Sequence, residues 1–179
     1  GPQNGSSMKW VDGSTLIYVP AGDFTMGDGV FALSHNVTLD GYWIQKTKVT
    51  NRMYEQCVKV GICSAPSQVL GGPVFSNPEF GNHPVVGVDW SQAQAYCAWT
   101  QGALPTEAQW EKAARGTNGN TYPWGNAAPT CGLLNFANCY SSTSTVEAFA
   151  ATGASPYGLL DMAGNTFEWV GDWYSEAYY

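Results

Sequence analysis

Positive charge is scarce in this sequence. Its 179 residues include seven Lys and Arg and two His against 14 Asp and Glu, which gives a formal net charge of −7. Binding to nucleic-acid phosphates or anionic lipid headgroups depends on clustered basic side chains, and the sequence has no basic run. We therefore expect neither a nucleic-acid partner nor attachment to a membrane surface.

Long apolar stretches are missing as well. The most apolar segments, 16–21 and 85–90, are far shorter than the roughly 20 residues that a membrane-spanning helix needs. The chain does not open with a charged segment followed by an apolar one, as a signal peptide does. We expect no membrane insertion, and we assign residues 1–9 to a tag and flexible lead and residues 10–179 to a single domain.

The composition is that of a globular domain with paired cysteines. Hydrophobic residues make up 44% of the chain, which suffices for a packed core at this length. Five Cys in a chain with few lysines indicate an exported protein. Cys57 with Cys63 and Cys131 with Cys139 each close a short loop, so we predict two local disulfides and an extracellular or cell-surface location. Free thiols in a reducing cytoplasm are the alternative.

Local patterns predict short strands and helices separated by long loops. Alternating apolar residues indicate strands within 10–26 and 37–44. Apolar spacing and capping patterns predict three helices: 50–61, capped by Thr50; 91–102, opened by Ser91; and 106–116, opened by Thr106.

Two segments have no such periodicity. Residues 61–84 contain many helix and strand breakers, among them Gly71, Gly72 and Pro73, and we expect a surface excursion there. Residues 117–156 form an unusually long loop for a compact domain. A loop of this length is normally functional or held by a metal or a disulfide.

Several short motifs follow one another between about residues 16 and 174. They are Phe-Thr-Met-Gly (24–27), Val-Thr-Asn (49–51), Pro-Val-Val with Val-Asp-Trp (84–90), Ala-Tyr-Cys-Ala-Trp (95–99), Leu-Pro-Thr-Glu-Ala-Gln-Trp-Glu (104–111), Ala-Ala-Arg-Gly (113–116), Tyr-Pro-Trp-Gly (122–125) and Tyr-Gly-Leu-Leu-Asp-Met-Ala-Gly-Asn (157–165). In this order they resemble the formylglycine-generating enzyme, or sulfatase-modifying-factor, family. The resemblance implies an α+β, C-type-lectin-like fold that is loop-rich, with two main helices and small twisted antiparallel sheets.

The chain departs from the family pattern in three places and at its end. Ala103 stands at a usual Arg, Gln109 at a usual Glu, and Thr166-Phe167 at a usual Val-Trp. Family members continue beyond the point that matches Tyr179, and active enzymes carry a copper-binding cysteine pair in that continuation. The resemblance therefore implies a domain whose C-terminal part is missing.

The segment 161–168 offers hard oxygen ligands of the kind that Ca²⁺ prefers. The resemblance implies a calcium site made by the side chains of Asp161 and Glu168 and the backbone carbonyls of Gly164 and Thr166. The alternative is that Asp161 caps a turn while Glu168 pairs with a cationic side chain. A weaker second site would use Asn135 and the carbonyl of Phe136, although the acidic partner expected for it is absent.

Redox and nucleophilic chemistry find little support in the residues present. His35 and His83 lie far apart and are expected at the surface or in turns. Cys97 falls on the apolar stripe of its helix, where thiols are usually inert. The resemblance also implies that Cys97 can bridge to a cysteine in the missing part.

Two functions remain open. One is a rigid scaffold that binds a protein or peptide ligand, as in variable proteins of diversity-generating retroelements or in sensor modules. The other is a copper- and O₂-dependent oxidase that converts a peptide cysteine to formylglycine. The departures at Ala103, Gln109 and Phe167 favour the binding function.

The end of the chain is expected to leave an apolar face uncovered. Residues 167–174 suit a strand with Phe167, Trp169 and Trp173 on one side. An exposed face of that size is unusual for a monomer. We expect a C-terminal continuation or a second chain to pack on it and complete the fold.

Overall fold

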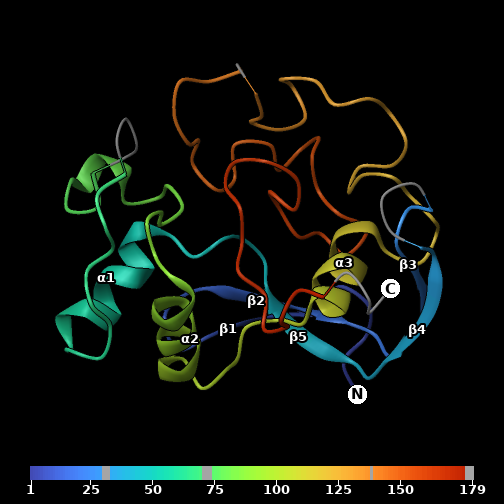
Figure 1. Cartoon of the computed structure of the whole chain (residues 1–179), viewed down its shortest axis with the longest axis horizontal. Helices are drawn as coiled ribbons and strands as arrows, with labels where there is room; N and C mark the ends of the chain where they lie inside the picture. The colour runs from blue at the N-terminus through green and yellow to red at the C-terminus, as the bar shows by residue number, and fades with distance from the viewer. Residues whose placement is uncertain (30–32, 70–73, 138, 176–179) are drawn as a thin grey trace.

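The computed structural model describes residues 1–29, 33–69, 74–137 and 139–175. Short strands and helices are joined by long coil segments (Figure 1). One antiparallel sheet has the order β1-β2-β5 and consists of β1 (Ser7–Lys9), β2 (Thr15–Val19) and β5 (Tyr42–Gln45), and a second pairs β3 (Gly22–Met26) with β4 (His35–Leu39). The small antiparallel sheets agree with the α+β class that the sequence predicts.

The N-terminal residues are part of the first sheet. Ser7 lies opposite Ile17 and Lys9 lies opposite Thr15, so β1 covers one edge of β2. The assignment of 1–9 to a flexible lead is therefore wrong for residues 7–9. Without β1, the backbone hydrogen-bonding groups along this edge of β2 would have no protein partner.

The predicted strand 37–44 is in fact two strands that belong to different sheets. The break falls at Asp40 and Gly41, between β4 and β5. A Cβ atom on Gly41 would lie 2.1 Å from the Tyr18 hydroxyl oxygen, so only glycine allows this close approach. The chain turns there from the small sheet to the larger one.

The three predicted helices are present with similar lengths, whereas the family resemblance suggested two main ones. They are α1 (Asn51–Lys59), α2 (Trp90–Trp99) and α3 (Glu107–Arg115), and a 3₁₀ turn, η1 (Pro78–Phe80), lies in the 61–84 excursion. Thr50 and Thr106 cap α1 and α3 as predicted. The cap of α2 is Asp89 rather than Ser91, because the Asp89 carboxylate and the Gln92 side chain form the capping box.

Two hydrophobic clusters hold the elements together. The first joins β2 and α3 to Leu159 and Met162. The second joins α1 and α2 and contains Tyr54, Cys57, Cys63 and Tyr96. Lys112 on α3 is buried and donates to the carbonyls of Pro20 and Gly22 at 2.9 and 2.8 Å, so it ties α3 to the β2–β3 turn.

The coil after α3 occupies the upper part of the molecule in the view of Figure 1. No helix or strand occurs in 117–137 or 139–156, as predicted. Within the described ranges, no helix has the length and apolar character needed to cross a bilayer. Gly71, Gly72, Pro73 and Tyr179 lie outside the described residues.

Candidate functional site

A groove of about 500 Å³ lies between β5, α2 and the loop that enters α3. We call it the central groove. Phe167 and Trp169 reach it from the C-terminal segment, and Lys48 and Glu168 stand at one side. Its other walls are mainly apolar and include Trp10, Tyr42, Ile44, Val85, Leu104 and Trp110.

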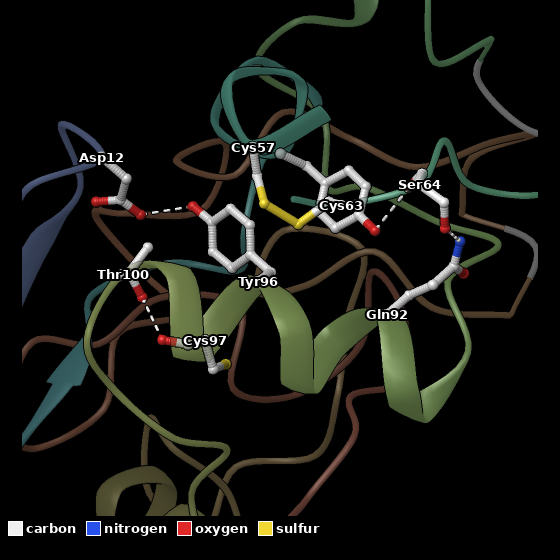
Figure 2. The surroundings of a disulfide bond; sticks show 9 residues. Asp12, Cys57, Cys63, Ser64, Gln92, Tyr96, Cys97 and Thr100 are labelled. Carbon is white, nitrogen blue, oxygen red and sulfur yellow. Dashed lines mark hydrogen bonds between the residues drawn. A yellow bond between two sulfur atoms is a disulfide. The ribbon is translucent and has the colours of Figure 1, made fainter. Parts of the chain in front are cut away.

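Cys97 lies on the wall of the central groove and is the one described cysteine outside a disulfide. It points away from the Cys57–Cys63 bond (Figure 2). Burial, with a smaller contribution from the negative charge of Asp12, raises the pKa of the thiol to about 11. The thiol is therefore protonated at neutral pH, which agrees with the inert role expected from the sequence.

A buried hydrogen-bond network surrounds Asp12, which sequence reasoning missed. The Tyr96 hydroxyl donates to the Asp12 carboxylate at 2.5 Å (Figure 2). The Gln45 amide donates to the same oxygen at 3.0 Å. The Ser14 N–H donates to the other oxygen at 3.0 Å. Asp12 thus links the β1–β2 turn to α2 and β5. The Asp-Gly-Ser turn at 12–14 was the available signal, but it does not reveal the distant partner.

Both predicted disulfides are present. Cys57 is joined to Cys63 and Cys131 is joined to Cys139. The first closes the end of α1 on the second hydrophobic cluster, and the second ties the long loop after α3. Two disulfides are typical of proteins from oxidising compartments.

The candidate calcium loop curls tightly. Asp161, Gly164 and Asn165 all have positive φ angles, of 57°, 82° and 63°. Asp161 is buried, and burial raises the pKa of its carboxyl group against the opposing effect of the Lys48 charge and the Asn165 amide. The Gly164 carbonyl accepts the Thr166 N–H at 2.8 Å. The structure thus brings Asp161, Gly164 and Thr166 into one loop.

Two side chains contact the same carboxylate oxygen of Glu168, Oε1. Lys48 Nζ lies 2.6 Å from Glu168 Oε1, and Trp110 Nε1 donates to the same oxygen at 3.1 Å. The Lys48 side chain is only 5% exposed. A Ca²⁺ ion on this oxygen would meet the ammonium at close range, so the residues do not fit a divalent cation while Lys48 stays in place. The contact is the cation pairing that the sequence left open as the alternative.

The residues predicted for the weaker second site take part in direct hydrogen bonds. The Asn135 side-chain amide donates to the Ser142 carbonyl at 2.8 Å, and its backbone carbonyl accepts the Asn165 N–H at 2.8 Å. Phe136 is exposed beside them. Direct hydrogen bonds and the Cys131–Cys139 disulfide close this loop. Across the described parts of the chain, no three His, Cys, Asp or Glu side chains gather into a group that could hold a metal ion.

The histidines stand apart from both loops described above. His35 is on β4, with Nδ1 3.1 Å from the Leu33 carbonyl oxygen. His83 lies 2.9 Å from the Thr143 hydroxyl and packs edge-on against Phe80. Neither belongs to a metal or nucleophile arrangement with the other.

The C-terminal aromatic segment is not a strand. Residues 167–175 have no strand pairing, and the Gly171 N–H donates to the Pro105 carbonyl in the loop that enters α3. The exposed fractions are 106% for Phe167, 49% for Trp169, 92% for Trp173 and 79% for Tyr174. The expected uncovered aromatic surface is therefore present, although it is built on irregular backbone.

The structure shows where two of the residues that differ from the family pattern lie. The Gln109 side chain closes the capping box of α3 with Thr106, as a glutamate would. Ala103 lines the central groove, where it leaves room that a longer side chain would fill.

The fold defined by these elements is that of the formylglycine-generating-enzyme type. It resembles PvdO from Pseudomonas aeruginosa, with a TM-score of 0.79 and 24% identity over 98% of this chain and 77% of that one. It also resembles Treponema denticola variable protein 1, with a TM-score of 0.67 and 22% identity over 90% of this chain and 74% of that one. These identities show the fold alone.

The profile of the sulfatase-modifying factor enzyme 1-like domain matches residues 5–179, and the chain belongs to this family. It is 34% identical over 182 residues to the serine/threonine-protein kinase Pkn1 of Chlamydia trachomatis, covering 92% of this chain and 29% of that protein. It is 31% identical over 222 residues to the formylglycine-generating enzyme of Mus musculus, covering 89% of this chain and 58% of that enzyme. The chain thus spans less than two thirds of these relatives.

Proposed function

We propose that this domain is a rigid scaffold that binds a protein or peptide ligand outside the cell or at its surface. The observation that carries the proposal is an aromatic platform on a fixed backbone. Trp90 and Trp173 stack with their ring centroids 6.3 Å apart, and Tyr174 follows directly. Trp and Tyr anchors dominate the binding energy of many protein interfaces.

The backbone beneath this platform is held before any ligand arrives. The Gly171 N–H donates to the Pro105 carbonyl at 2.8 Å, and the Glu107 N–H donates to the Asp172 carboxylate at 2.5 Å. The Trp90 indole N–H donates to the Val170 carbonyl at 2.9 Å. A ligand that docks on a pre-organised surface loses less conformational freedom, which favours affinity.

The relatives support an accessory role. The stretch similar to this chain covers 29% of a protein named as a serine/threonine kinase in Chlamydia trachomatis. A domain that forms a minor part of a longer protein suits a sensing or docking module. The structural likeness to a variable protein shows that this fold occurs there too.

We further propose that a C-terminal continuation of the chain fills the central groove. The groove is apolar and large, and Phe167 and Trp169 face it, whereas Trp173 and Tyr174 do not line it. The solved structures of this fold extend beyond the matched part, since this chain covers 77% and 74% of two of them. A disulfide from Cys97 on the groove wall is a natural link to that segment. A separate second chain in the groove is the competing outcome.

A copper- and O₂-dependent oxidase is the second candidate. It is favoured by the 42% identity over 118 residues to the formylglycine-generating enzyme of Thermomonospora curvata, which covers 58% of this chain. In that case the copper-holding cysteine pair belongs to the continuation. Calcium is left out of both proposals because Lys48 pairs with Glu168.

One experiment separates the two functions. The full-length natural protein is used to select peptides from a displayed random library, and the affinity of the best peptide is measured. The scaffold function expects Trp173→Ala to weaken binding by about 10-fold or more, with Tyr140→Ala as the matched exposed-aromatic control. The copper-loaded protein is also incubated in air with a cysteine peptide and a thiol reductant, because conversion of the thiol to an aldehyde, sulfide and water by O₂ takes up two further electrons. Conversion of that cysteine to formylglycine, detected by mass spectrometry, would establish the oxidase instead.

A further inference from the structure

A buried lysine faces the Glu168 carboxylate of the 161–168 loop. Lys48 lies between β5 and Thr50, the cap of α1, and its side chain is 5% exposed. A lysine is rarely buried to this extent unless its charge is paired.

The pairing comes from the loop on the opposite side. Glu168 Oε1 lies 2.6 Å from Lys48 Nζ, 120 positions away in the sequence. The Lys48 ammonium therefore offsets the negative charge of Glu168.

The loop that carries Glu168 is tightly wound. The left-handed conformations at Asp161 and Asn165 are unfavourable for residues other than glycine and persist only where surrounding contacts enforce them. A Cβ atom on Gly164 would lie 2.4 Å from the Asn135 carbonyl oxygen, so the loop is also pressed against its neighbour. The loop backbone is therefore fixed by its own contacts, and Lys48 supplies the positive charge beside Glu168.

We propose that the Lys48 ammonium is the resident cation of the 161–168 loop and stands where a divalent cation would otherwise bind. The wild-type protein is then stable without Ca²⁺ and gains nothing from it. Removal of the ammonium leaves two carboxylates and the loop carbonyls, which is a donor set for Ca²⁺. A hollow of about 330 Å³, lined by Lys48, Gly164, Thr166 and Glu168, gives an ion access to the Glu168 carboxylate.

The test compares thermal unfolding of the full-length protein in excess EDTA and in excess CaCl₂. Wild type is expected to melt at the same temperature in both. Lys48→Met, which keeps the length of the side chain without its charge, is expected to melt about 6–12 °C lower in EDTA and to recover in CaCl₂. Lys48→Arg keeps the charge and is expected to stay indifferent to calcium.

The matched control is Lys46→Met. Lys46 forms a partly exposed ion pair with Glu147 at 3.4 Å, so its loss should change the melting temperature little and create no calcium response. The double variant Lys48→Met with Glu168→Gln should lose the recovery in CaCl₂, because the calcium would bind through Glu168.

Two results would overturn the proposal. One is a Lys48→Met protein whose stability is unchanged by calcium. The other is calcium binding by wild type, measured by isothermal titration of CaCl₂, that Glu168→Gln removes. The titration uses a protein without substitution at Lys48, so it decides the question even where Lys48→Met does not fold.

Discussion

The molecule contains two regions in which carboxylates are compensated in different ways. Around α1 and α2, Asp12 is 2% exposed and is satisfied by a phenol, an amide and a backbone N–H. In the 161–168 loop, Glu168 pairs with the ammonium of Lys48. Neutral donors fix geometry through several short bonds, whereas a single cation balances charge and leaves the loop backbone to other contacts.

The difference also appears in what supports each region. The Asp12 network lies beside the stacked rings of Tyr54 and Tyr96, with centroids 5.6 Å apart, and the Cys57–Cys63 disulfide. The coil after α3, which we call the loop region, has no helix or strand within its described residues. It is held by hydrogen bonds, by the ion pairs of Glu147 and Glu168, by Cys131–Cys139 and by the packing of Leu159 and Met162. Substitutions should therefore act through packed side chains in the first region and through backbone fit in the second.

The largest effect is expected for Gly164→Ala in the loop region. The substitution adds strain at a φ of 82° and a contact of 2.4 Å with the Asn135 carbonyl oxygen, and we expect a loss of about 3 kcal/mol or more in unfolding free energy. Gly158→Ala is the matched control, because its φ is 87° but no atom lies within 4 Å of the added Cβ. Chemical denaturation measures both. Equal losses of unfolding free energy in the two variants would mean that the contact with the Asn135 carbonyl oxygen does not contribute to the effect.

Tyr96→Phe tests the Asp12 network and should come next in size. The variant removes the 2.5 Å hydrogen bond and leaves a buried carboxylate short of one donor, so we expect a loss of about 2–3 kcal/mol. Tyr54→Phe removes a hydroxyl that donates to the neutral Ser64 carbonyl at 3.0 Å, and about 1 kcal/mol is expected. A loss no greater for Tyr96→Phe than for Tyr54→Phe would contradict the special role of Asp12.

These two regions differ in how far the sequence predicts them. The helices, two of their three caps and both disulfides follow from signals within a few residues, such as the capping box at Thr106 and the short Cys57–Cys63 loop. The cap of α2 was misplaced because Ser91 and Asp89 both fit a capping pattern. The prediction of a strand at 167–174 was wrong, because alternation of apolar residues does not tell whether another strand lies beside the segment to pair with it.

The contacts of the charged side chains could not be predicted either, because the partners are far apart in the sequence. Lys48 and Glu168 are 120 positions apart, and Tyr96 and Asp12 are 84 apart. The residues of the 161–168 loop suggested a cation but not whether it is an ion or a side chain. Only the fold brings Lys48 to Glu168.

Removal of the Cys131–Cys139 disulfide should have a smaller effect than Tyr96→Phe. The bond closes a short loop that is partly exposed, so its loss is expected to lower the unfolding free energy by about 2 kcal/mol, chiefly by freeing the unfolded chain. The double variant Cys131→Ser with Cys139→Ser should show this in chemical denaturation. Cys57→Ser with Cys63→Ser should cost more, because both cysteines are buried in the second hydrophobic cluster. The reverse order would show that the loop region is the more disulfide-dependent one.

The smallest effect concerns Cys97, whose titration reports the charge of Asp12 with little change in stability. Burial and then Asp12 raise the pKa of the thiol to about 11, so alkylation by iodoacetamide should be slow at neutral pH and accelerate up to about pH 11. Because the folded pKa exceeds that of an unfolded thiol, near 8.5, the thiol's contribution favours folding below that value and fades as the pH rises toward 11. Asp12→Asn removes the negative charge and should move the alkylation midpoint to lower pH, whereas Asp40→Asn, an exposed carboxylate elsewhere, should leave it in place. Cys97→Ser gives the background rate. An unchanged alkylation midpoint in Asp12→Asn would show that burial alone raises the pKa of the Cys97 thiol and that the charge of Asp12 does not act on it.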